Sequence, residues 1–229
     1  MGQAQGLIGV FSILLIAFLM SNNKKAINYK TIIWGLALQL TLAVLIMLTP
    51  IGEPFFKWFD TAIKTLLAFS KEGSAFLFES FVTHEIEPGL INFAFIALPT
   101  VIFFSALMSM LYHYGIMQKL IKIISKIMQK TMKTSGAETT SISANIFVGQ
   151  TEAPLVVRPF ISKMTQSELM AVMVGGFATV AGGVMAIYVT LLSHIEGIAG
   201  HLLAASIMSA PAALVIAKII YPETEETMS

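Results

Sequence analysis

The sequence has no cysteine and few charged side chains. The absence of cysteine from all 229 residues excludes disulfide bonds and thiolate metal sites. Charged residues make up only 12% of the chain, about half of the 25% that is usual in a soluble domain. The net charge of +1 gives no sign of a nucleic-acid partner. Because 56% of the residues are hydrophobic, we predict an integral membrane protein.

Long apolar runs predict an all-α fold with several transmembrane helices. A helix needs about 20 apolar residues to cross a bilayer core about 30 Å thick. The first run is marginal in length, and we predict a retained span because no basic region or cleavage site accompanies it. The predicted spans are 4–20, 31–49, 91–112 with a kink at Pro99, 167–193 with interruptions at the glycine pairs 175–176 and 182–183, and 199–220.

Three segments outside the predicted spans are rich in charged residues. Residues 54–70 repeat aromatic residues at helical spacing, which predicts an interfacial amphipathic helix. The acidic stretch 71–90 is predicted to be a loop, and not a metal site, because it has no regular ligand spacing. Lysines recur every three or four residues further along, which predicts a basic amphipathic helix on a membrane surface or against the bundle. These are Lys119, Lys122, Lys126, Lys130 and Lys133.

Residues 134–163 predict a re-entrant helical hairpin. Two short apolar arms, about 138–147 and 153–161, are joined by Val-Gly-Gln-Thr-Glu at 148–152. Each arm reaches about 15 Å, half of the bilayer core. Non-helical backbone at that depth needs protein or a wet cavity around it, so the tip is a candidate binding site. Thr151 is predicted to cap the second arm, and an ordinary capped helix outside the membrane is the alternative.

Glu152 is the first candidate for a functional residue. A carboxylate inside a membrane is costly unless it is paired or solvated, and it usually marks a transport path. A structural ion pair with Arg158 is the alternative, but six positions is a poor helical spacing for such a pair. Gln150 and Thr151 add donors and acceptors beside Glu152. The three side chains can together bind the hydrogen-bonding groups of a polar ligand.

Several motifs resemble the concentrative nucleoside transporter (CNT) family, of the bacterial nucleoside permease type. They are LPTVIFFSALMSMLYHYGIMQ at 98–118, SANIFV from Ser143, GQTEAPLVVRPF at 149–160 and ATVAGGVMAIY at 178–188. They occur in the family's order over most of the chain, but they match only the N-terminal half of a family member. The resemblance implies a cation-coupled nucleoside symporter of the plasma or inner membrane, and not an enzyme. It also implies half of an inverted-repeat carrier, with elevator-like alternating access.

The resemblance assigns roles to particular residues. It places the nucleobase against Gln150, Thr151, Glu152 and Val184, and it places a sodium ion among the side chains of Asn145 and Thr179 and the carbonyls of Val148 and Val180. Proton coupling through Glu152 remains an alternative to sodium. Asn145 and Thr179 also have a simpler interpretation, in which they only satisfy backbone groups at helix breaks.

The same resemblance sets expectations for organisation and partners. It divides the chain into a scaffold part at 1–70, an outer loop, third span and cytoplasmic amphipathic helix at 71–133, the hairpin at 134–163, and a glycine-broken helix, last span and start of a cytoplasmic loop at 164–229. It implies a homotrimer in membrane lipid and a C-terminal half, with a second hairpin and the ribose-contacting helices, outside these residues. This chain alone is therefore expected not to transport.

Lysine and arginine positions predict the orientation. With the N-terminus outside, eleven of these residues lie on one side of the membrane and three on the other, which fixes the cytoplasmic side. The hairpin is then predicted to enter from the cytoplasm. A non-catalytic membrane scaffold or channel subunit is the alternative function. An intramembrane hydrolase using Glu152 or Ser143 is a weaker one, because the sequence has neither Gly-x-Ser-x-Gly nor His-Glu-x-x-His.

Overall fold

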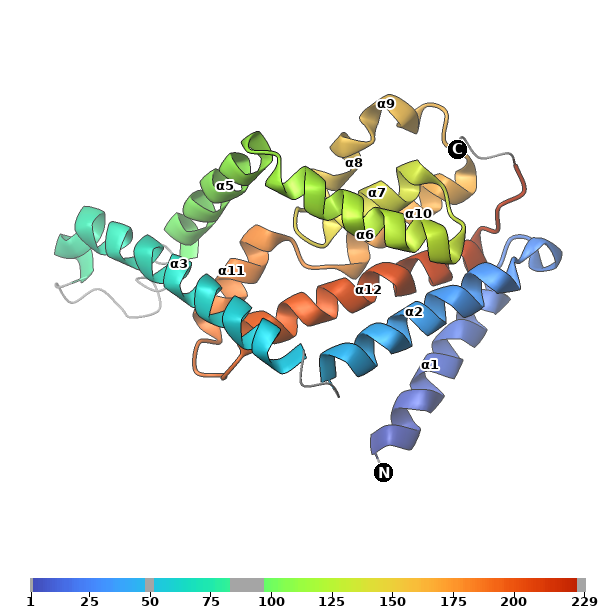
Figure 1. Ribbon diagram of the computed structural model, residues 1–229, viewed down its shortest axis with the longest axis horizontal. Helices are drawn as coiled ribbons and strands as arrows, with labels where there is room; N and C mark the ends of the chain where they lie inside the picture. Colours follow the sequence, from blue (N-terminus) through green and yellow to red (C-terminus); the bar gives the residue numbers. More distant parts are fainter. Residues whose placement is uncertain (1, 48–51, 83–96, 226–229) are drawn as a thin grey trace.

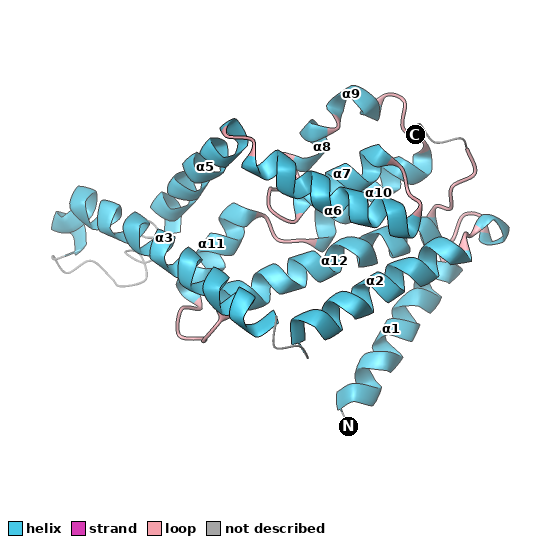
Figure 2. Ribbon diagram, viewed as in Figure 1, coloured by secondary structure: helices cyan, strands magenta, loops and turns pink. Residues whose placement is uncertain are grey.

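The computed structural model describes residues 2–47, 52–82 and 97–225, and within these ranges all regular structure is helical (Figures 1 and 2). The predicted all-α class is confirmed. The elements are α1 (Gly2–Leu19), a 3-10 helix (Lys24–Ala26), α2 (Tyr29–Met47), α3 (Gly52–Val82), α5 (Leu98–His113), α6 (Ile116–Met132), α7 (Gly136–Asn145), α8 (Ala153–Val156), α9 (Arg158–Ile161), α10 (Gln166–Ala178), α11 (Gly182–Leu191) and α12 (Ile198–Ile220).

Three segments of the described chain are long and apolar enough to cross a membrane. They are 29–46 in α2, 166–191 across α10 and α11, and 198–220 in α12. The pair α5 and α6 would add a fourth as one broken span, although the two helices are bent by 77°. The apolar stretch of α1, Ile8–Leu19, is shorter than the predicted first span. These lengths agree with a multi-pass membrane protein.

Helix α12 lies at the centre of the bundle, with α2, α3 and α10 packed around it (Figure 1). Large side chains of α12, such as Leu214, are fully buried, and Pro211 is accommodated inside the helix. Gly35 on α2 permits a close approach to α12, because a Cβ atom at this position would overlap the Val215 side chain of α12 and would lie 2.7 Å from the Met132 side chain of α6. The core therefore joins the first, middle and last parts of the chain.

Helix α3 is longer than the sequence pattern predicts. The interfacial helix was expected at 54–70 and a loop at 71–90, but the helix continues to Val82. Proline is absent from 71–82, and a single glycine such as Gly73 costs a helix only about 1 kcal/mol. The rest of that predicted loop, and the beginning of the predicted span 91–112, lie outside the described residues. Pro99 is in the first turn of α5, a position where proline is accepted. The predicted kink or register adjustment at Pro99 depends also on residues before 97, which lie outside the described residues.

Candidate functional site

Where the hairpin was predicted, the structure has two short helical arms and a non-helical tip. The first arm is α7, and Ser135 and Glu138 form a capping box at its start. The second arm is divided into α8 and α9 at Val157. Pro159 explains this division, because proline has no N–H to donate to the Leu155 carbonyl and so interrupts the helical hydrogen bonds across Val157. Thr151 does not cap the second arm: Glu152 is the residue before α8, and its side chain makes no capping hydrogen bond.

The break in the following helix lies beside the hairpin tip. It was predicted at both glycine pairs, but Gly175 and Gly176 lie inside α10, and the chain is extended only at 179–181. Gly175 serves helix packing, because a Cβ atom there would lie 2.6 Å from Ile142 of α7. The N–H of Gly182 donates to the Phe147 carbonyl at 3.2 Å. One hydrogen bond thus joins the tip of the hairpin to the break.

Asn145 and Thr179 meet where α7 and α10 end. The amide nitrogen of Asn145 donates to the Gly175 carbonyl and to the Thr179 hydroxyl, both at 2.6 Å. The Thr179 hydroxyl in turn donates to the Asn145 carbonyl at 2.9 Å. Among the described residues, no donor reaches the carbonyl oxygens of Val148 or Val180, which belong to the same two helix breaks. The four residues predicted to hold sodium therefore come from two adjacent helix breaks, and they offer the oxygen atoms that a hard cation prefers.

Glu152 lines a cavity of about 490 Å³ between α5 and the hairpin tip. Its carboxylate folds back against Gly149, where a Cβ atom would overlap it. Glu152 makes no ion pair or side-chain hydrogen bond within the described ranges, so the predicted alternative of a pair with Arg158 is not realised there. Apolar side chains line most of the remaining wall, among them Phe104, Met108, Phe147 and Leu155. An unpaired acid in such a wall is suited to bind a polar group of a ligand.

The other predicted nucleobase residues are exposed and do not line this cavity. Gln150 and Thr151 lie on the tip itself, and the Cβ atom of Gln150 lies beside Gly176 of α10. Val184 is in the first turn of α11, with 43% of its surface exposed. The contact of these residues with a base stays a prediction.

Tyr112 on α5 is a member of the site that the sequence pattern did not reveal. It lines the same cavity as Glu152, and its buried hydroxyl has no hydrogen-bond partner among the described residues. Its ring packs against the cluster of Ile121, Ala144, Val148 and Ala153. Only the bend between α5 and α6 brings this tyrosine to the hairpin, so no spacing rule along the chain would have found it.

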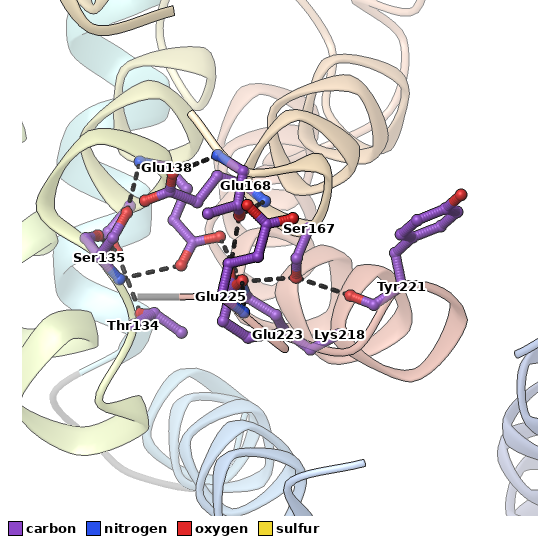
Figure 3. Close-up of polar contacts among 11 residues, drawn as sticks. Thr134, Ser135, Glu138, Ser167, Glu168, Lys218, Tyr221, Glu223 and Glu225 are labelled. Atoms are coloured by element: carbon purple, nitrogen blue, oxygen red, sulfur yellow. Dashed lines mark hydrogen bonds and ion pairs between the residues drawn. The ribbon is translucent and has the colours of Figure 1, made fainter. Parts of the chain in front are cut away.

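A buried charge cluster lies where α7 and α10 begin and α12 ends (Figure 3). Lys218 pairs with the fully buried Glu138 at 2.9 Å, donates to Ser167 at 2.9 Å and lies 3.3 Å from Glu223. Glu168 forms a second capping box with Thr165 at the start of α10. Lys218 therefore holds the starts of two helices, including the first arm of the hairpin, to the end of the central helix.

Comparisons with known proteins agree with this arrangement. Residues 8–81 match the family described as the N-terminus of Na+ dependent nucleoside transporters, and residues 94–194 match the "Gate" family, described as nucleoside recognition. An uncharacterized transporter of Haemophilus influenzae is 44% identical over 99% of this chain and 53% of its own length. Sodium/nucleoside cotransporter 2 of Rattus norvegicus is 42% identical over 96% of this chain and 32% of its own length.

Solved structures of related sequence have the same fold as this chain. CNTnw in an inward-facing, substrate-bound state has a TM-score of 0.90 at 42% identity, over 100% of this chain and 55% of that one. A CNTnw variant in an outward-facing state has a TM-score of 0.88, over 97% of this chain and 53% of the other. The chain thus spans about half the length of its bacterial relative and of these structures. Both the motifs and the fold place this chain among transporters and not among enzymes. We conclude that this chain belongs to the concentrative nucleoside transporter family.

Proposed function

We propose that this chain is the nucleobase-binding half of a sodium-coupled nucleoside symporter. The observation that carries the proposal is Glu152, an acid without a protein partner in the described chain, at a non-helical tip beside a cavity. Because no protein group among the described residues pairs with this exposed carboxylate, it is free to bind a ligand, and an acid inside a membrane usually marks a transport path. A nucleobase offers N–H donors to such an acid, and Gln150 and Thr151 supply donors and acceptors next to it.

The coupling ion is proposed to bind at the two helix breaks. Thr179 and Asn145 already exchange hydrogen bonds there, and two carbonyl oxygens of the same breaks have no donor in the described chain. Oxygen ligands at unwound helix ends are how such carriers hold sodium. Because Phe147 hydrogen-bonds to Gly182, sodium at this position would also fix the hairpin tip that carries Glu152. Ion and substrate would then favour the same arrangement of the tip.

Thermal unfolding of the purified protein tests this function directly. Uridine and adenosine are titrated in sodium chloride and then in choline chloride, because a ligand stabilises the state that it binds. We expect either nucleoside to raise the melting temperature in sodium and to have a much smaller effect in choline. Equal shifts in both salts that vary with pH would support proton coupling in place of sodium. The absence of a shift with any nucleoside would favour a membrane scaffold.

Thr179→Val is expected to weaken the response to sodium. Valine keeps the shape of threonine but removes the hydroxyl oxygen, so the sodium concentration for half-maximal nucleoside binding should rise about tenfold. Saturating sodium should restore nucleoside binding. Thr190→Val is the matched control, because its hydroxyl donates only to the Ala186 carbonyl within α11. An unchanged sodium requirement in Thr179→Val would contradict the proposed ion site.

In the proposed transport cycle, the part of the chain that contains the hairpin moves. The hairpin at 134–163 and the broken helix α10–α11 would move against a scaffold formed by the first 70 residues, in a homotrimer with the N-terminus outside. The buried contacts of Lys218 with Glu138 and Ser167 support treating α7, α10 and α12 as one rigid unit. The rest of the substrate site would come from a region that resembles the part of the relatives' chains outside the match to this chain.

A further inference from the structure

Helix α6 has three distinct faces. One is buried against the bundle and consists of Met117, Ile121, Ser125, Met128 and Met132. A second, on the opposite side at 100° per residue, consists of the exposed lysines Lys119, Lys122, Lys126 and Lys130, continued by Lys133. Between them lies a third face of large apolar side chains, each 39–57% exposed: Ile116, Leu120, Ile123 and Ile127. Packing of α6 against the bundle accounts for the buried face but not for the exposed apolar face.

The lysine face of α6 has no counter-charge of its own. Residues 116–133 include no aspartate or glutamate. Within the described parts of the chain, the ion pairs join other residues, and none involves these five lysines. The row of lysines lies beside an exposed apolar strip. Together they are complementary to a surface with negative charge on its outside and an apolar layer beneath it. The anionic leaflet of a membrane is such a surface.

The buried face of α6 connects this surface to the hairpin. The hydroxyls of Ser125 and Thr140 of α7 lie 3.1 Å apart, and Gln129 donates to Ser125 at 2.8 Å. Ser143 of α7 contacts the Met128 sulfur at 3.7 Å. Whatever holds α6 in place therefore also holds the first arm of the hairpin.

We propose that α6 binds anionic phospholipids, with phosphate groups on the lysine face and acyl chains against the exposed isoleucines and leucine. The binding would stabilise the unit formed by α6 and α7. The lipid site is separate from the proposed substrate and sodium sites, because none of the residues that would contact lipid lies at the tip or at the helix breaks.

Thermal unfolding in lipid nanodiscs tests the proposal. The intact protein is compared in phosphatidylcholine alone and in phosphatidylcholine with phosphatidylglycerol. We expect phosphatidylglycerol to raise the melting temperature by about 5 °C at low salt, and we expect high salt to reduce this shift because it screens exposed charges. Replacing the five lysines by glutamine should abolish the shift, whereas replacing them by arginine should preserve it.

Lys24→Gln, Lys25→Gln and Lys30→Gln together form the matched control, because these lysines are predicted to lie on the same side of the membrane but outside α6. This control should keep the shift. If the five-glutamine variant does not fold, pairs such as Lys119 with Lys122 and Lys126 with Lys130 should each remove part of it. An equal shift in the glutamine variants would overturn the proposal. No shift in the unaltered protein would also overturn it and would point to an acidic protein partner.

Discussion

Glu152→Gln is expected to weaken nucleoside binding by about 10- to 100-fold. Glutamine keeps the size of glutamate but removes the negative charge and replaces one acceptor oxygen with a donor. Hydrogen bonds to a charged group contribute about 1.5–3 kcal/mol, which corresponds to this range of affinity. The measurement is calorimetric or thermal-shift titration of uridine and adenosine in sodium chloride.

Stability should hardly change in the same variant, which separates binding from folding. Glu152 is exposed and makes no ion pair within the described residues, so the melting temperature without nucleoside should match that of the unaltered protein. Glu196→Gln, at an exposed glutamate between α11 and α12, is the matched control and should bind normally. Wild-type affinity in Glu152→Gln would remove the main support for the proposed function. Loss of a hydrolytic turnover instead would revive the enzyme alternative.

Lys218→Met is expected to destabilise the fold strongly. Methionine fills a similar volume but leaves the fully buried Glu138 carboxylate without its cation, 2.9 Å away in the unaltered protein. Removing one partner of a buried ion pair typically costs about 3–5 kcal/mol. Ser167 and Glu223 also lose the ammonium group that they contact. The expected result is a much lower melting temperature, or poor recovery of the protein in detergent.

Two further variants distinguish a lost ion pair from a general effect of removing lysine. Lys163→Met, at an exposed lysine just before α10, should change stability by no more than about 0.5 kcal/mol. The double variant Lys218→Met with Glu138→Gln should recover part of the loss, because it no longer buries an unpaired charge. If Lys218→Met were as stable as Lys163→Met, the cluster would not hold the helix ends together.

The sequence predicted this site in part because its signals are local. The two short apolar arms beside the tip, the lysine period of α6 and the apolar length of α12 each depend on spacing within one segment. Of the two predicted interruptions, the glycine pair 182–183 borders the observed break, whereas the pair 175–176 does not, because glycine alone does not end a helix. Gly175 is needed for packing against Ile142, whereas the chain leaves the helix at Thr179, where tertiary hydrogen bonds to Asn145 replace those of the helix.

By itself, the sequence determined that this is a helical membrane protein with an acid at a hairpin tip, because hydrophobic length and helical period are properties of neighbouring residues. Only the tertiary structure decided that Lys218 pairs with Glu138, that Tyr112 shares a cavity with Glu152, and that α6 has a third face. These contacts join residues far apart in the chain. They follow from which helices pack together, and no pattern along a single helix contains that information.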